Sequence, residues 1–166
     1  KKLSMKPPGR SILVVAILAL LGLMGGIVYY ASLDNDDLSM ATIELESVEL
    51  IDVNSIENRA TLKVTFLVGN PGDVTVTVPV ITFQLFADGS EVGNGTYSTE
   101  DVAMPGRAAF YPDAEIPLNT RMSIVMSEMN ESVYDKIVSG QPVQYTASGM
   151  ITVESAWSIV ELDFDT

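Results

Sequence analysis

The sequence predicts an all-β fold, a β-sandwich with one short helix, preceded by a single N-terminal transmembrane helix. Three observations lead to this prediction. An uncharged apolar run occupies residues 11–32. Alternating apolar and polar residues, typical of half-buried strands, recur at short spacing through residues 40–166. Only one segment of that region has helical spacing, so its strands are not separated by helices as in a βαβ protein.

The apolar run, SILVVAILALLGLMGGIVYYAS, contains no charged residue and no proline over its 22 residues. At about 1.5 Å per residue such a helix is roughly 33 Å long, which is enough to cross a hydrocarbon core of about 30 Å. Tyr29 and Tyr30 lie at its outer end, where aromatic rings with a polar tip favour the interface. We therefore expect residues 11–32 to span a membrane.

The charges on either side of this helix give its orientation. Basic residues precede it and acidic residues follow it: Lys1, Lys2, Lys6 and Arg10, then Asp34, Asp36 and Asp37. The positive-inside rule then places residues 1–10 in the cytoplasm as a basic stub. Residues 33–39 follow as a polar linker and hinge, and residues 40–166 as an extracytoplasmic domain. The expected location is the cell membrane, with a single pass.

Two other interpretations of the N-terminus were considered. A cleaved secretory signal has a shorter apolar core, and cleavage after Ala31 or Ser32 would put a tyrosine at the −3 position, where small residues are needed. An archaeal pilin or archaellin leader ends at a glycine, as Gly9-Arg10 suggests, but the acidic residue common early in such helices is missing. Retention as an anchor is the preferred interpretation.

Small residues recur on one face of the predicted membrane helix at three- and four-residue spacing: Ala16, Ala19, Gly22 and Gly26. Such faces let two helices approach closely in lipid, and Gly22 to Gly26 forms a GxxxG motif. Glycine is also simply common in membrane helices. The functional prediction is contact with another membrane-protein subunit or with a second copy of this chain.

The strands are predicted in chain order. The first, residues 41–50, is a long edge-like strand with a bulge near Ser47, where the alternation changes phase. The clearest is residues 62–68, with Leu62, Val64, Phe66 and Val68 on one face. Pro79 argues for an edge position or a strand break. The other predicted strands are 74–80, 81–85, 91–97, 108–111, 121–126, 144–148 and 151–164, the last two covering one or two strands.

Turn residues separate these strands at 54–58, 70–73, 88–89 and 104–106. The single helical segment is 128–139, with Ser127 as its N-cap, Gly140 as its stop, and Met129, Val133 and Ile137 on one stripe. Trp157 is expected in the core rather than in a ligand site.

Composition and charge exclude several classes of site. The chain has no cysteine and no histidine, which excludes disulfides, the usual zinc sites and His-based triads. All 22 acidic residues follow residue 33, where only five basic residues oppose them, so the exterior part has a formal charge of −17. This charge disfavours binding to nucleic acids and to anionic lipid headgroups.

Several carboxylate groups were considered as sites. Asp34, Asp36 and Asp37 lack the glycine and glutamate of a calcium loop. Glu100-Asp101, and Glu154 with Glu161, have no sign of a pocket around them. We expect a protein that is not an enzyme and has no metal or cofactor. Two N-glycosylation sequons lie in the exterior domain, at Asn94 and Asn130, and Asn130 could instead cap the predicted helix.

Residues 62–149, about 90 of the 166, resemble the late-embryogenesis-abundant type 2 proteins with the water-stress-and-hypersensitive-response (WHy) domain, in an archaeal, membrane-anchored form. The segments that carry the resemblance are LKVTFLVGNPG with Asn70-Pro71, the valine-rich strand after it, FQLFADGSEVGNG, the Pro105-Gly106 turn, the short helix, and SGQPVQYTASG. The resemblance implies an immunoglobulin-like or fibronectin-like sandwich with one small helix, and a stress-protective or binding module without catalytic residues.

The membrane anchor and the acidic exterior depart from a soluble desiccation protectant. The leading prediction is therefore a non-catalytic, membrane-anchored accessory or scaffold subunit of an envelope complex. The alternatives are a stress-protective or ligand-binding WHy module, and a stator or filament component of an archaeal surface appendage.

Overall fold

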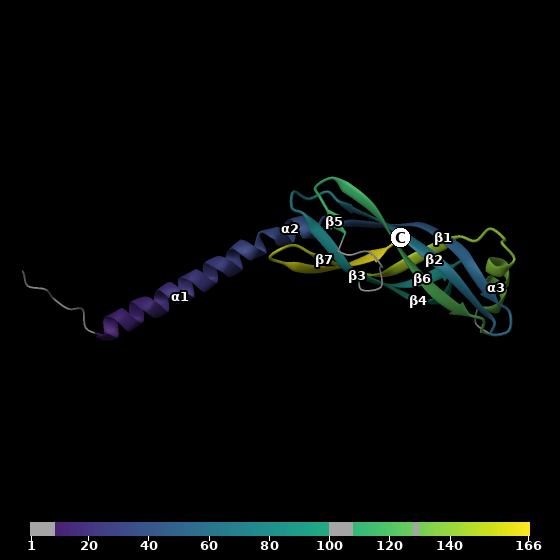
Figure 1. Cartoon of the computed structure of the whole chain (residues 1–166), viewed down its shortest axis with the longest axis horizontal. Helices are drawn as coiled ribbons and strands as arrows, with labels where there is room; N and C mark the ends of the chain where they lie inside the picture. The colour runs from purple at the N-terminus through teal and green to yellow at the C-terminus, as the bar shows by residue number, and fades with distance from the viewer. Residues whose placement is uncertain (1–8, 100–107, 128–129) are drawn as a thin grey trace, which may run out of the picture.

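The computed structural model describes residues 9–99, 108–127 and 130–166. Within these ranges it contains three helices, α1 (Gly9–Ser32), α2 (Asp34–Leu38) and α3 (Glu131–Val138). The strands in the same ranges are β1 (Thr42–Asn54), β2 (Arg59–Asn70), β3 (Val76–Ala87), β4 (Ser90–Ser98), β5 (Ala109–Phe110), β6 (Ala114–Val125), β7 (Tyr145–Glu154) and β8 (Ile159–Asp165). Figure 1 shows α1 projecting from one end of an elongated β body, with α3 at the other end. The predicted turn at 104–106 lies outside the described residues.

One sheet contains β1, β2 and β6 in that order, all antiparallel. Its central strand β2 has the clearest alternation in the sequence and buries the four predicted residues, Leu62, Val64, Phe66 and Val68. β1 is an edge strand, as predicted. Its register shifts between Leu45 and Ser47, which confirms the expected bulge.

The second sheet has the order β4-β3-β7-β8, and β5 pairs with the start of β3. Residues 74–80 and 81–85, predicted as separate strands, contribute to the single strand β3. Pro79 does not end this strand because it lies where β3 changes neighbours. Pairing with β7 is irregular between Thr77 and Val80, and pairing with β4 begins at Val80. The proline nitrogen therefore falls outside the regular ladder.

The two sheets pack face to face around one core. Phe66 of β2 meets Phe83 of β3 edge to face, with ring centroids 4.9 Å apart, and Phe164 of β8 lies 5.7 Å from Phe66 in the same way. Each such pair adds about 0.5–1.5 kcal/mol beyond its buried area. Gly95 makes room for the Phe83 ring, since a Cβ there would lie 2.2 Å from it. A mostly β chain with two sheets and one apolar N-terminal helix agrees with the prediction.

Helix α1 contains the predicted apolar run. None of its 24 residues is buried. The helical stretch Gly9–Leu38 has a mean hydropathy of 2.7 in its most apolar window, so it is long and apolar enough to cross a membrane. The 24 residues of α1 alone extend about 36 Å at about 1.5 Å per residue.

Residues 33–39, predicted as a polar turn, form α2 instead. Leu33 keeps helical backbone angles, φ −67° and ψ −29°, so α2 follows α1 almost without interruption. Three of the five residues of α2 are acidic: Asp34, Asp36 and Asp37. Leu38 at its end is fully buried in the core of the β body.

α2 contacts two loops of the β body. Gly72, in the turn between β2 and β3, lies so close that an added Cβ would be 3.0 Å from the carbonyl oxygen of Asp37. In the hairpin between β7 and β8, Ser155 Oγ donates a hydrogen bond to Asp34 Oδ2 at 3.0 Å, and Ser158 Oγ donates to the Asn35 side-chain oxygen. These contacts and the burial of Leu38 fix the end of α1 to the two sheets.

Helix α3 begins later than predicted. Its N-cap position is Asn130 rather than Ser127. The side-chain oxygen of Asn130 accepts a hydrogen bond from the backbone N–H of Ser127 at 2.7 Å, so it organises the segment before the helix. Met129 lies outside the described residues. Gly140 follows the helix at φ +69°, as a C-terminal stop requires. The buried stripe of the helix is Val133, Tyr134 and Ile137.

Candidate functional site

The small-residue face of α1 is open. Ala16, Ala19, Gly22 and Gly26 are all exposed. A Cβ added at Gly22 or Gly26 would meet no heavy atom within 4 Å. No atom of the β body therefore touches Gly22 or Gly26, although the side chain of Trp157 borders an open cleft at Gly26, and a neighbouring helix could approach the backbone of this face closely. The predicted helix contact stays a prediction.

An open groove of about 520 Å³ crosses the outer face of the second sheet. Its floor is a row of three paired residues, Phe83, Gly95 and Gly149, in β3, β4 and β7. The Phe83 side chain is buried in the core and the glycines have none, so the floor is backbone. The surrounding side chains are mostly polar and come from four strands: Thr82, Gln84, Asn94, Thr96, Ser148, Met150 and Asp163.

The two sequon asparagines have different environments. Asn94 is exposed on β4 at the edge of the groove. Asn130 is only 7% exposed, and its side-chain nitrogen, the atom to which a glycan would be attached, donates a hydrogen bond to the carbonyl of Val125 at 3.1 Å. A glycan on Asn94 needs no rearrangement of the fold, whereas a glycan on Asn130 would break this bond.

The Asn70-Pro71 motif has a structural role next to α2. Asn70 is 2% exposed. Its side-chain nitrogen donates to the carbonyl oxygens of Val74 at 2.8 Å and Phe110 at 2.9 Å, and its side-chain oxygen accepts from the N–H of Gly72 at 3.2 Å. One side chain therefore joins the β2–β3 turn to β5 and holds the turn on which α2 packs.

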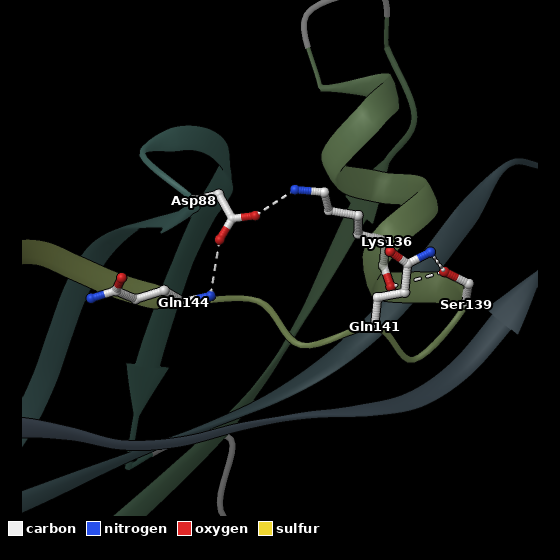
Figure 2. Close-up of polar contacts among 5 residues, drawn as sticks. All are labelled: Asp88, Lys136, Ser139, Gln141 and Gln144. Carbon is white, nitrogen blue, oxygen red and sulfur yellow. Dashed lines mark hydrogen bonds and ion pairs between the residues drawn. The ribbon is translucent and has the colours of Figure 1, made fainter.

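A polar contact joins α3 to the second sheet (Figure 2). Asp88, in the predicted turn between β3 and β4, accepts a hydrogen bond from Lys136 Nζ of α3 at 2.8 Å and one from the backbone N–H of Gln144 at 3.1 Å. The hydrogen bond from Lys136, followed by the one from Gln144, lowers the pKa of Asp88. Burial and the nearby charge of Asp88 raise the pKa of Tyr145. Both carboxylate oxygens of Asp88 therefore have a structural partner.

The carboxylates considered as sites are dispersed or already paired. Asp34 accepts the hydrogen bond from Ser155. The backbone of Glu154, the last residue of β7, lies opposite that of Ile159 at the start of β8, and Glu161 lies opposite Thr152. In the described part of the chain, no three His, Cys, Asp or Glu side chains are grouped closely enough to hold a metal ion. Glu100 and Asp101 lie outside that part.

Trp157 is not in the core. It occupies the tip of the β7–β8 hairpin and is 65% exposed, so the prediction of a core position is wrong. Alternation correctly places Val160, Leu162 and Phe164 against the core from β8. The tryptophan lies before this strand begins, where alternation no longer applies.

No protein-family model matches the chain, and no curated protein matches it. Among solved structures, a protein from Arabidopsis thaliana aligns with 75% of this chain and 78% of its own at 15% identity, with a TM-score of 0.50. A protein from Archaeoglobus fulgidus aligns with 74% of this chain and 93% of its own at 16% identity, with a TM-score of 0.44.

A third solved structure, assigned provisionally to the late embryogenesis abundant (LEA) proteins, aligns with 94% of this chain and 87% of its own at 10% identity, with a TM-score of 0.44. At these identities the likeness concerns the fold alone. A protein described in those terms is thus among the structures to which the fold of this chain is similar.

Proposed function

We propose that this chain is a non-catalytic, single-pass membrane protein whose external domain serves as an accessory or scaffold subunit of an envelope complex. The observation that carries the proposal is the open small-residue face of α1 on a helix fixed to the β body. A helix that only tethered a domain would need neither a bare face nor a packed junction. Here both are present, through Gly22 and Gly26 on α1 and through Leu38 on α2.

The proposed orientation has the N-terminus in the cytoplasm and the β body outside. Basic residues precede α1 and acidic residues follow it, which is the asymmetry that the positive-inside rule uses. The length and apolarity of α1 support the crossing itself. The packed junction would then hold the external domain close to the membrane surface.

The proposed domain is an immunoglobulin-like sandwich of the WHy type. Two antiparallel sheets around one core, with one short helix, α3, in the described part of the domain after α2, are compatible with that assignment. The described polar clusters, such as Asp88 with Lys136, use their hydrogen bonds for packing. This favours a binding or structural role over catalysis.

The test replaces Gly22 and Gly26 by leucine. Leucine inserts into bilayers at least as readily as glycine, so the anchor should survive while close helix contact is lost. Native electrophoresis of gently solubilised membranes should show wild-type chain in a defined complex and the double variant running alone. The control is Ile17→Leu with Val28→Leu on the opposite side of α1, which should leave the complex intact. Unchanged comigration of the glycine variant would place assembly on the exterior domain.

The groove on the second sheet favours ligand binding as a second candidate function. Its side chains offer amide and hydroxyl groups, and the acidic exterior would repel anions, so the fitting ligand is neutral and hydroxyl-rich. Neutral oligosaccharides should then raise the melting temperature of the full chain in detergent. The rise should be smaller for Gln84→Ala in the groove than for Glu57→Gln far from it. If oligosaccharides raise the melting temperature of the two variants equally, the groove is excluded as the binding site.

A further inference from the structure

The β7–β8 hairpin places the one tryptophan of the chain beside α1. The side chain of Trp157 lines an apolar cleft of about 330 Å³. The other residues of the cleft all belong to α1: Leu23, Gly26, Ile27 and Tyr30. Figure 1 shows the hairpin, in yellow, extending from the β body toward the C-terminal end of α1.

Hydrogen bonds hold the tip of this hairpin in place. Ser155 Oγ accepts from the backbone N–H groups of Trp157 at 3.2 Å and Ser158 at 3.1 Å. The same hydroxyl donates to Asp34 of α2 at 3.0 Å. The backbone of Trp157 is therefore tied to the helix that continues α1, and its position along α1 is fixed.

The depth of the cleft matches a membrane interface. Gly26 lies six residues before Ser32, the end of the predicted span. At about 1.5 Å per residue this distance is about 9 Å. Interfacial side chains and amphipathic helices lie at about this depth, roughly 5–10 Å into the headgroup and acyl boundary. Tryptophan and tyrosine are enriched there because their rings are apolar and their N–H or O–H can stay hydrated.

The tip is also an uncharged part of an acidic domain. Residues 155–160, SAWSIV, contain no charged side chain. Ile159, near Trp157 in the sequence, is 64% exposed. Anionic headgroups would repel most of the exterior domain but not this segment. Its exposed apolar side chains would leave water on contact with lipid, which is favourable.

We propose that Trp157 is a second membrane contact, inserted at the outer-leaflet interface beside Tyr30. This inference rests on the proposed membrane crossing by α1. With the helix and the hairpin both in lipid, the β body does not rotate about the long axis of α1.

The test uses the intrinsic fluorescence of the full chain in phospholipid vesicles, because Trp157 is its only tryptophan. Flotation first establishes whether the chain is in the membrane. Emission wavelength, quenching by iodide on both sides of the bilayer, and quenching by lipids brominated at different depths then locate the indole. We expect blue-shifted emission, weak iodide quenching, and stronger quenching by bromines near the headgroup than by bromines at the chain end.

The matched control moves the tryptophan to the opposite end of the β body, as Trp157→Phe with Ile56→Trp. Residue 56 is 96% exposed in the β1–β2 turn, so this variant should emit as in water and be quenched by iodide. If wild type floats with the vesicles but behaves like this control, the hairpin contact is wrong and the anchor stands. If wild type does not float, the proposed anchor and this inference both fail.

Discussion

At the scale of single residues, the side chain of Asn70 acts as an internal crosslink. Its amide group serves three backbone partners, at Gly72, Val74 and Phe110, in a site closed to water. Buried backbone groups need such partners, since an unpaired one costs about 1–3 kcal/mol. The sequence marks this position only as an asparagine before a proline, a pattern common at strand ends.

Replacing Asn70 by alanine should lower the free energy of unfolding by about 1–3 kcal/mol, because the buried carbonyl oxygen of Phe110 and the partly buried one of Val74 lose their donor. Asn70→Asp should also destabilise the fold, since a carboxylate keeps the acceptor for Gly72 but cannot donate. Chemical denaturation followed by circular dichroism measures the loss. Asn94→Ala, on the exposed face of β4, is the control and should change stability by no more than about 0.5 kcal/mol.

Asp88 should make stability depend on pH under acidic conditions. Its folded-state pKa is lowered, chiefly by the hydrogen bond from Lys136. The stabilisation is therefore present above the unfolded-state pKa of about 3.9 and is lost as the pH falls through the lower folded-state value. We expect Asp88→Asn to be less stable than wild type at neutral pH and to approach it as the pH falls through this range.

The matched control for this pH series is Asp113→Asn, which also replaces an aspartate at positive φ, 60° against 50° for Asp88. Asparagine tolerates this conformation, so neither variant should strain its turn. If the difference in unfolding free energy between wild type and Asp88→Asn is the same at every pH, the pH dependence does not come from Asp88.

At the scale of elements, strands were predictable where one face is buried. Leu62 to Val68 alternate because β2 has the core on one side, and in β1 the bulge near Ser47 shifts the phase of the alternation along that strand. α2 was not predictable in the same way. Its five residues are too few to show a helical period, and its polarity suits a turn equally well. It is helical because α1 leads into it and Leu38 reaches the core.

Leu38→Ala should lower the free energy of unfolding by about 2–5 kcal/mol, the range for large-to-small changes at buried leucines. The residue is fully buried although it belongs to the segment between the membrane helix and the sheets. Denaturation of the detergent-solubilised chain provides the measurement. Leu33→Ala, at a position 52% exposed, should have little effect. Equal effects of the two substitutions would mean that α2 does not dock.

At the scale of the whole molecule, the charge distribution predicts the membrane topology, and pairing across strands determines which residues meet on the surface. The small-residue face of α1 could be predicted because a helix repeats locally. The groove on the second sheet could not. Its floor combines Phe83, Gly95 and Gly149, which become neighbours only through the register of three strands. For the same reason the exposure of Trp157 depends on where a hairpin ends, not on its own residue type.

Protease added outside intact cells should remove the exterior domain and spare an N-terminal tag, because the basic flank keeps the N-terminus inside. Trypsin has a target at Arg59, next to the β1–β2 turn, whose side chain is 50% exposed. Immunoblots against a tag at each end of the chain report separately on the N-terminal segment and on the exterior domain. Permeabilised cells are the control and should lose both tags. If the C-terminal tag survives in intact cells, the proposed topology is wrong.

Because α1 passes into α2 almost without interruption, the β body should move together with α1 as one rigid unit. With no flexible stalk, any tilt of α1 in a bilayer is a tilt of the sheets as well. The 13 residues of β1 extend about 43 Å at about 3.3 Å per residue, so a change in tilt of about 10° moves the α3 end sideways by roughly 7 Å. Helices longer than the hydrocarbon core tilt more as the bilayer thins. The far end of the molecule would therefore convert a small change in bilayer thickness into a displacement large enough for a neighbouring protein to sense.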